Sequence, residues 1–272
     1  MAFPPFVGVV RKLVLANVAA FFAVALLQWL APGPASLLLD NLLLQPMAVL
    51  HGEIWQIVTY SFLHFGLLDI LFAMLTLWFC GSMLEGAYGS RWLAELYFTS
   101  AIGGALLASA LSFTHWLRLN PYSAASGAWA GVFGLLVAIA MRFGDQEFLL
   151  FFVIRIRARH MVAIYILIAV ALLLKDANSF GALLQLAGAL CGYLYVRHAP
   201  RRGLAFGFGE QYFAMRNAYY RARRRRAARK FEVYMGKQGR KIRFDEDGRY
   251  IDPDDRGNDS ARKDPNDKHW MN

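Results

Sequence analysis

The sequence predicts an all-α membrane protein with six membrane-spanning helices and a basic, partly disordered C-terminal tail. Hydrophobic residues make up 57% of the 272 residues and charged residues only 18%, and the mean hydropathy is +0.36. These values are too apolar for an ordinary soluble domain. Apolar runs long enough to cross a bilayer recur along the chain, and the composition becomes strongly basic after Arg197.

The first predicted span covers residues 13–31 and follows Arg11 and Lys12. This run exceeds the roughly 7–15 apolar residues of a signal-peptide core, so we expect a retained helix. Five further spans are predicted at about residues 55–80, 91–111, 125–142, 160–174 and 179–197, each bounded by Gly, Pro or charged residues. Residues 32–54 are expected to form a loop with a short amphipathic segment, and residues 148–156 a strand or a helix extension.

The distribution of Lys and Arg among the short loops predicts the orientation in the membrane. With the N-terminus inside, the outside loops contain only Arg118 and Lys175. The inside segments contain the remaining loop cations and the tail: Arg11, Lys12, Arg91, Arg142, Arg155, Arg157 and Arg159. We therefore expect both termini in the cytoplasm, and a multi-pass protein of a bacterial inner (plasma) membrane.

Three regions are predicted from the changes in composition: a membrane domain at residues 1–200, a polybasic juxtamembrane helix at 201–243 and an acidic, disordered tail at 244–272. The basic cluster of the second region consists of Arg221, Arg223, Arg224, Arg225, Arg226, Arg229 and Lys230. We expect it to bind anionic lipid headgroups, where each basic residue contributes about 1 kcal/mol. Contact with nucleic acid or the ribosome is the less favoured alternative, since arginines beside aromatic residues also suit RNA.

Neither a metal nor a cofactor is expected. The two cysteines, Cys80 and Cys191, both lie in apolar stretches. Buried small hydrophobic residues explain them better than a disulfide or a metal site does.

The stretch from Pro121 to Ala138 is the strongest candidate for a site. A loop of small residues runs directly into an apolar helix, and Trp129 is the one bulky residue near its start. Small residues allow helices to approach closely in lipid. Non-helical backbone at membrane depth persists only where protein or a water-filled cavity satisfies it, so we expect a functional site here.

Several motifs within residues 50–197 resemble the rhomboid family of intramembrane serine proteases. They are Glu53–Gln56 with Tyr60–His64, Leu84-Glu85 with Gly89-Ser90, Gly127–Leu136, and Gln185–Gly192. The resemblance implies a serine nucleophile on the fourth helix and a histidine base on the sixth. It also implies a histidine and an asparagine on the second helix as donors to the oxyanion.

The chain departs from the family pattern at each of these chemical positions. Alignment without gaps puts Trp129 at the nucleophile, whereas an alignment on Ser126 restores a serine but needs three extra residues. Gln185 stands at the histidine base in either case, and an amide cannot act as a general base. On the second helix His64 matches, but Asp69 and Ala73 replace the second histidine and the asparagine.

The sequence therefore predicts a pseudoprotease that binds transmembrane segments or membrane-protein clients. The expected cavity residues are His64, Asp69, Trp129, Phe133 and Gln185, with Asp69 paired to Gln185. The expected helix-packing residues are Gly127, Gly131, Gly188 and Gly192. The alternative is an active serine endopeptidase that uses Ser126 with an unconventional base. A transporter is disfavoured because broken helices in repeated halves are not evident.

Overall fold

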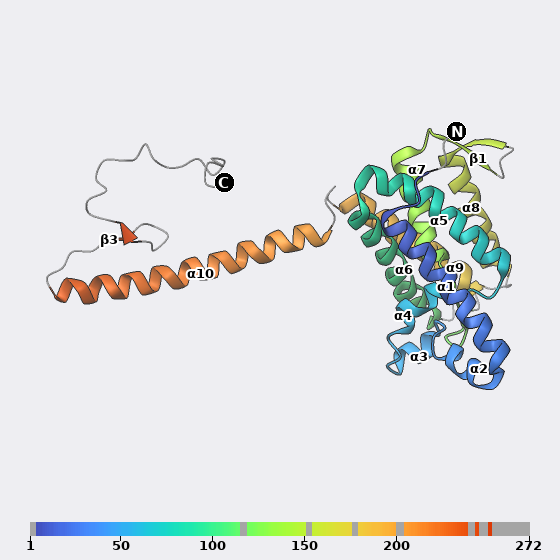
Figure 1. Ribbon diagram of the computed structural model, residues 1–272, viewed down its shortest axis with the longest axis horizontal. Coiled ribbons are helices and arrows are strands. Elements are labelled where there is room, and N and C mark those ends of the chain that lie inside the picture. The colour runs from blue at the N-terminus through green and yellow to red at the C-terminus, as the bar shows by residue number, and fades with distance from the viewer. Residues whose placement is uncertain are drawn as a thin grey trace. The chain divides into compact units, whose positions relative to one another are not determined.

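The computed structural model describes residues 4–114, 119–150, 154–175, 179–199, 204–238, 243–244 and 250–251. It divides into two compact units, residues 1–204 and 205–272, which are described separately below. The boundary lies close to the one predicted after residue 200. In the part of the chain that the structure describes, the first unit is a bundle of helices with one small hairpin, and the second contains one long helix (Figure 1).

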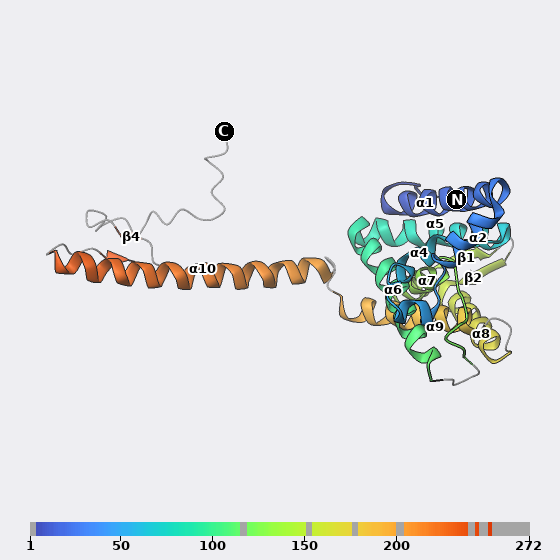
Figure 2. The same cartoon turned by 90° about the horizontal axis from the view of Figure 1, so that it is seen from below.

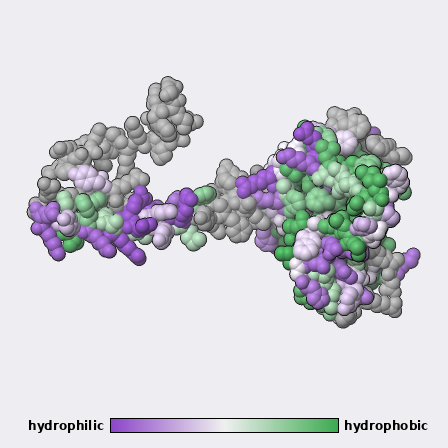
Figure 3. Space-filling model, turned by 60° about the horizontal axis from the view of Figure 1, so that its bottom comes forward, coloured by the Kyte–Doolittle hydropathy of each residue, from purple (hydrophilic) through white to green (hydrophobic). Residues whose placement is uncertain are grey.

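Among the described residues of the first unit, four helices are long and apolar enough to cross a membrane: α1 (Gly8–Leu30), α5 (Leu67–Tyr88), α6 (Ser90–Ser112) and α9 (Ser179–His198). Two further apolar helices, α7 (Trp129–Phe143) and α8 (Ala158–Leu174), are shorter. Every predicted span thus falls on a helix. Large apolar side chains such as Trp29 and Leu167 are exposed on this unit, and Figure 3 shows apolar patches on its visible face.

The predicted start of the second span at residue 55 is wrong. Residues in this region form α4 (Gln56–Thr59) and the 3-10 helix η1 (Tyr60–Phe62), and α5 begins only at Leu67. Buried polar groups hold this segment in place. Gln56 Oε1 accepts the Gln45 N–H at 2.9 Å, and Tyr60 Oη donates to the Ala101 carbonyl at 2.8 Å. A hydropathy pattern cannot distinguish such a buried segment from the helix that follows it.

Two connecting regions contain regular secondary structure. Residues 32–54, predicted mainly as a loop, contain α2 (Pro32–Asp40) and α3 (Pro46–Leu50). The strand alternative is the one observed for the apolar segment after α7, where β1 (Glu147–Leu150) pairs antiparallel with β2 (Ile154–Arg157). Residues 151–153 lie outside the described part.

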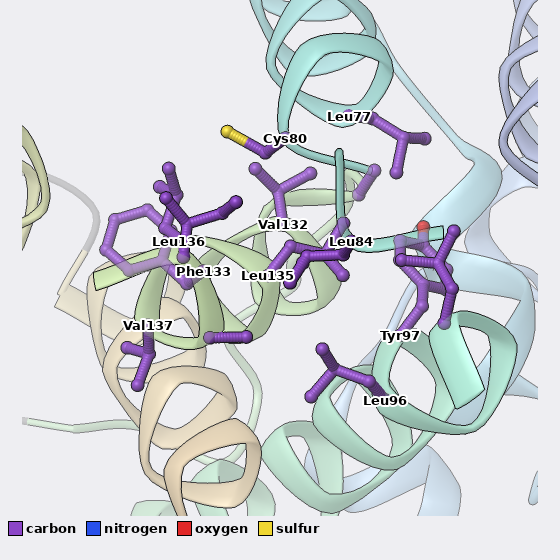
Figure 4. Close-up of a cluster of buried hydrophobic side chains, with 14 of the residues drawn as sticks. Leu77, Cys80, Leu84, Leu96, Tyr97, Val132, Phe133, Leu135, Leu136 and Val137 are labelled. Carbon is purple, nitrogen blue, oxygen red and sulfur yellow. The ribbon is translucent and has the colours of Figure 1, made fainter. Parts of the chain in front are cut away.

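Helix α7 is the centre of the first unit, because it packs against α5, α6, α8 and α9 (Figure 2). All residues from Ala130 to Ile139 are buried. Figure 4 shows how Val132, Leu135 and Leu136 of α7 lie among side chains of α5 and α6. These neighbours include Leu77, Cys80 and Leu84 of α5 and Leu96 and Tyr97 of α6.

Glycines let α6, α7 and α9 approach at backbone distance. A Cβ on Gly104 of α6 would lie 2.9 Å from Gly188 Cα on α9. A Cβ on Gly188 would lie 2.8 Å from Ala130 Cα on α7, and one on Gly192 would reach the backbone of Gly134. Close backbone approach through small residues is how helices associate in lipid.

The second unit contains α10 (Leu204–Lys237) and the short antiparallel pair β3 (Arg243–Phe244) and β4 (Tyr250–Ile251). The helix predicted for the polybasic region is present. Most of residues 244–272, for which we expected disorder, lie outside the described residues.

Candidate functional site

The loop before α7 is held by backbone hydrogen bonds to the segment that precedes α5. Leu44 and Ala125 exchange two such bonds, at 3.0 and 2.9 Å, and the Gly127 N–H donates to the Tyr60 carbonyl at 2.9 Å. Gly127 has φ +102°, a conformation that is strained for residues with a side chain. Gly127, predicted as a helix-packing residue, therefore belongs to the loop, and its role there is conformational. Gly131, one turn into α7, does pack on a helix, against the Tyr97 ring of α6.

His64 acts as a hydrogen-bond acceptor at the start of α7. It is buried, and its Nε2 accepts the N–H of Ala128, the N-cap residue of α7, at 3.3 Å. An accepting Nε2 belongs to a neutral ring. Burial lowers the pKa of His64, although the nearby carboxylate of Asp69 opposes that shift. In this arrangement His64 positions the loop and its Nε2 has no proton to donate to an oxyanion.

A hydrogen bond joins Trp129 to Asp69, two residues at which the chain departs from the family pattern. Trp129 Nε1, on the first residue of α7, donates to Asp69 Oδ1 in the first turn of α5 at 2.6 Å. A bond of this length to a carboxylate is at the strong end of protein hydrogen bonds. The pairing of Asp69 with Gln185 that we expected is not the one observed, because the indole N–H takes that place.

The ring of Trp129 is fixed by aromatic neighbours as well. Its centroid lies 6.4 Å from that of Phe133, one turn along α7, and 6.5 Å from that of Tyr165 on α8. Phe133 and Tyr165 are 6.2 Å apart in an edge-on arrangement. Sequence reasoning missed Tyr165, although it is the one aromatic residue in the apolar α8 segment, and that isolation was an available signal.

A cavity of about 440 Å³ lies at this end of α7. Its walls come from the segments before α5 and α7, from the first turns of α5 and α7 and from the first two turns of α9. Its lining includes the apolar residues Leu43, Phe65 and Leu184 and the residues Asp69, Ser126, Trp129 and Gln185. The structure therefore brings Asp69, Trp129 and Gln185 together and adds Ser126. His64 lies beside the cavity at the base of the loop, Phe133 lies behind Trp129, and Ala73 is buried in the core.

Comparison with known proteins identifies a family for this chain. Residues 11–222 match the family described as eukaryotic integral membrane protein (DUF1751). The chain belongs to this family. It is also 27% identical over 153 residues to Rhomboid-like protein 19 of Arabidopsis thaliana, a match that covers 54% of this chain and 49% of the relative.

Two other relatives share shorter regions. RHOMBOID-like protein 1 of Arabidopsis thaliana is 35% identical over 108 residues, which is 39% of this chain and 26% of the relative. The Rhomboid protease GluP of Bacillus subtilis is 31% identical over 93 residues, which is 34% of this chain and 17% of the relative. The chain thus spans less than half the length of each of these relatives. It is a rhomboid-like integral membrane protein, whereas the bacterial membrane and the orientation of the termini stay predictions.

The described lining of the cavity contains a serine, an aspartate and a glutamine, namely Ser126, Asp69 and Gln185. Its described lining contains no histidine, and none of the described hydrogen bonds joins the Ser126 hydroxyl to a histidine ring. A hydroxyl without a neighbouring base is a poor nucleophile. The carboxylate of Asp69 would repel a developing oxyanion, where a protease places donors.

The basic cluster of α10 surrounds the helix. Arg221, Arg225, Arg226 and Arg229 line a hollow of about 410 Å³ whose floor contains Ala218 and Ala222. With about 100° between successive residues of a helix, Arg223, Arg224 and Lys230 point to other sides, and all three are exposed. Figure 3 shows hydrophilic residues along much of α10.

Proposed function

We propose that this protein is a proteolytically inactive rhomboid relative that binds transmembrane segments of client membrane proteins at its cavity. The hydrogen bond between Trp129 Nε1 and Asp69 Oδ1 carries this proposal. It places a large, fixed side chain where the ungapped alignment expects a nucleophile. It also engages the carboxylate of Asp69, which stands where the family pattern has a donor to the oxyanion.

Replacement of the nucleophile, the base and the oxyanion donors together is harder to compensate than the loss of any one of them. In a soluble serine protease, loss of the catalytic triad lowers turnover by on the order of 10⁶, and the remaining activity comes from an intact oxyanion hole. Here Gln185 lines the cavity in place of the base, and Asp69 and Ala73 replace the oxyanion donors. We therefore expect no measurable peptide cleavage.

The size and surroundings of the cavity support binding. A volume of about 440 Å³ is too small for a whole helix but accommodates one or two side chains. Phe65, Leu67 and Leu68, next to the cavity at the start of α5, are exposed by 50%, 71% and 66%. A client helix can therefore rest on this apolar surface while one of its side chains enters the cavity.

A fluorophosphonate probe tests the inactive state, because it labels an activated serine. We expect no labelling of the purified protein and no cleavage of a transmembrane model substrate, and Ser126→Ala should change neither result. The Rhomboid protease GluP serves as the positive control. Cleavage that Ser126→Ala abolishes would establish the alternative, an active protease using Ser126, whose side chain does line the cavity.

We also propose that α1, α5, α6, α7, α8 and α9 all cross the membrane and that both termini are cytoplasmic. The Lys and Arg distribution supports this orientation. Single cysteines at residues 34 and 260, in a background without Cys80 and Cys191, test it with a membrane-impermeant reagent. Labelling from outside is expected at residue 34 only, and outside labelling at residue 260 would contradict the orientation.

For α10 we propose attachment to anionic lipid. The seven residues of its basic cluster, Arg221 to Lys230, follow α9 in the sequence, and each contributes about 1 kcal/mol near an anionic surface. The full chain in vesicles with anionic lipid should resist trypsin cleavage within α10 more than in neutral vesicles. Protection of α10 from trypsin that does not depend on lipid charge but appears when RNA is added would favour the nucleic-acid alternative.

A further inference from the structure

The carboxylate of Asp69 offers a means of client selection. We propose that the cavity prefers client segments that carry a lysine or arginine near the end of their apolar stretch. This inference rests on the proposed client-binding function and specifies which clients bind. It follows from the acceptor groups in the cavity and from the negative charge of Asp69, which has no cationic partner among the described residues.

Only part of the acceptor capacity of Asp69 is used by the described residues. Oδ1 accepts the indole N–H of Trp129 at 2.6 Å. Oδ2 lies beside the loop, 3.8 Å from the position that a Cβ on Gly127 would occupy. An ionised carboxylate can accept several hydrogen bonds, and no described hydrogen bond or ion pair reaches Oδ2. The absence of a side chain at Gly127 keeps this approach open.

The negative charge of Asp69 has no cationic partner in the described part of the chain. His64 is a titratable group close to Asp69, but its Nε2 accepts the Ala128 N–H, so its ring is neutral in this arrangement. No lysine or arginine is among the described residues that line the cavity. The indole of Trp129 is a neutral donor. Ionisable groups inside a membrane usually pair with an opposite charge, and a client cation would provide one.

The remaining lining favours a long basic side chain over an acidic one. Ser126 and Gln185 add oxygen acceptors close to the carboxylate. Leu43, Phe65 and Leu184 supply apolar walls on which the methylene stem of lysine or arginine can lie while its charged end reaches the acceptors. A client glutamate or aspartate would instead meet a like charge.

Photocrosslinking with designed helices tests this preference directly. The full chain, with benzoylphenylalanine at Leu43, is reconstituted in lipid nanodiscs with one of three otherwise identical apolar peptides. These peptides carry Lys, Leu or Glu one turn from the end of the span. We expect the Lys peptide to crosslink about tenfold more than the Leu peptide, which corresponds to one decade of affinity, and the Glu peptide no more than the Leu peptide.

Two substitutions assign the preference to Asp69. Asp69→Asn keeps the shape and an oxygen acceptor for Trp129 but removes the charge, so the ratio of Lys-peptide to Leu-peptide crosslinking should fall to near one. Asp40→Asn, on the exposed end of α2, is the matched control and should keep the preference.

The outcomes separate this inference from the proposed function. Equal crosslinking of all three peptides, or a Lys preference that survives Asp69→Asn, overturns the inference and leaves client binding intact. Absence of crosslinking for every peptide overturns the client-binding proposal as well. If Asp69→Asn does not fold, the three peptides on the unsubstituted chain still decide.

Discussion

The interface of α6, α7 and α9 and the cavity at the start of α7 are neighbours, yet they differ in what they retain of the rhomboid pattern. At the interface, Gly188 and Gly192 stand where the family places small residues, and backbone approaches backbone there. In the cavity, Trp129 and Gln185 stand where the ungapped alignment expects a serine and a histidine. The difference shows that the fold depends on packing positions, whereas a reaction depends on a few side chains that can change without loss of the fold.

The largest loss of unfolding free energy is expected from adding a side chain at the interface of α6, α7 and α9. In Gly188→Ala the new Cβ would collide with the carbonyl group of Ala130, which is backbone and cannot rotate away. Overpacking of this kind costs up to about 3 kcal/mol. Chemical unfolding of the protein in detergent micelles measures the loss.

Gly86→Ala is the control for that substitution. Nothing lies within 4 Å of a Cβ at Gly86, also in a helix, so stability should stay the same or rise by about 0.5–1 kcal/mol. Equal losses for the two variants would show that the packing positions are not what holds α7 against α9.

An intermediate effect is expected from the bond between Trp129 and Asp69. Trp129→Phe keeps an aromatic ring against Phe133 and Tyr165 but removes the donor, and Asp69→Asn removes the charge. A hydrogen bond to a charged group contributes about 1.5–3 kcal/mol. In a double-mutant cycle of unfolding free energies the two substitutions should therefore be strongly non-additive. If the two changes in unfolding free energy simply add, the hydrogen bond does not stabilise the fold around the cavity.

A smaller effect is expected at Glu85, a polar residue within a motif that the chain retains. Its Oε1 and Oε2 accept the N–H groups of Val9 and Val10 at 2.7 and 3.0 Å, and Ser90 Oγ also donates to it. Glu85 thus satisfies the first turn of α1 from another helix. Glu85→Gln leaves one acceptor oxygen and should cost about 1 kcal/mol, as loss of a helix cap does.

Asp145→Asn is the matched control for Glu85→Gln. Asp145 is 83% exposed and forms a surface ion pair with Arg159 at 3.1 Å, and such pairs contribute little. Its unfolding free energy should stay within experimental error of that of the unsubstituted chain. A smaller loss for Glu85→Gln than for Asp145→Asn would contradict the capping role.

The sequence by itself determined the apolar segments, the glycine spacing on α9 and the replaced chemical positions. These features are local, because they depend on hydropathy and on residue types a few positions apart. Only the tertiary structure decided where α5 begins, since the segment of Gln56 and Tyr60 is held by Gln45 and Ala101. It also decided that Asp69 pairs with Trp129, a residue 60 positions away, and that Ser126 lines the same cavity. Contacts between such distant residues exist only after the helices have packed, so no local pattern specifies them.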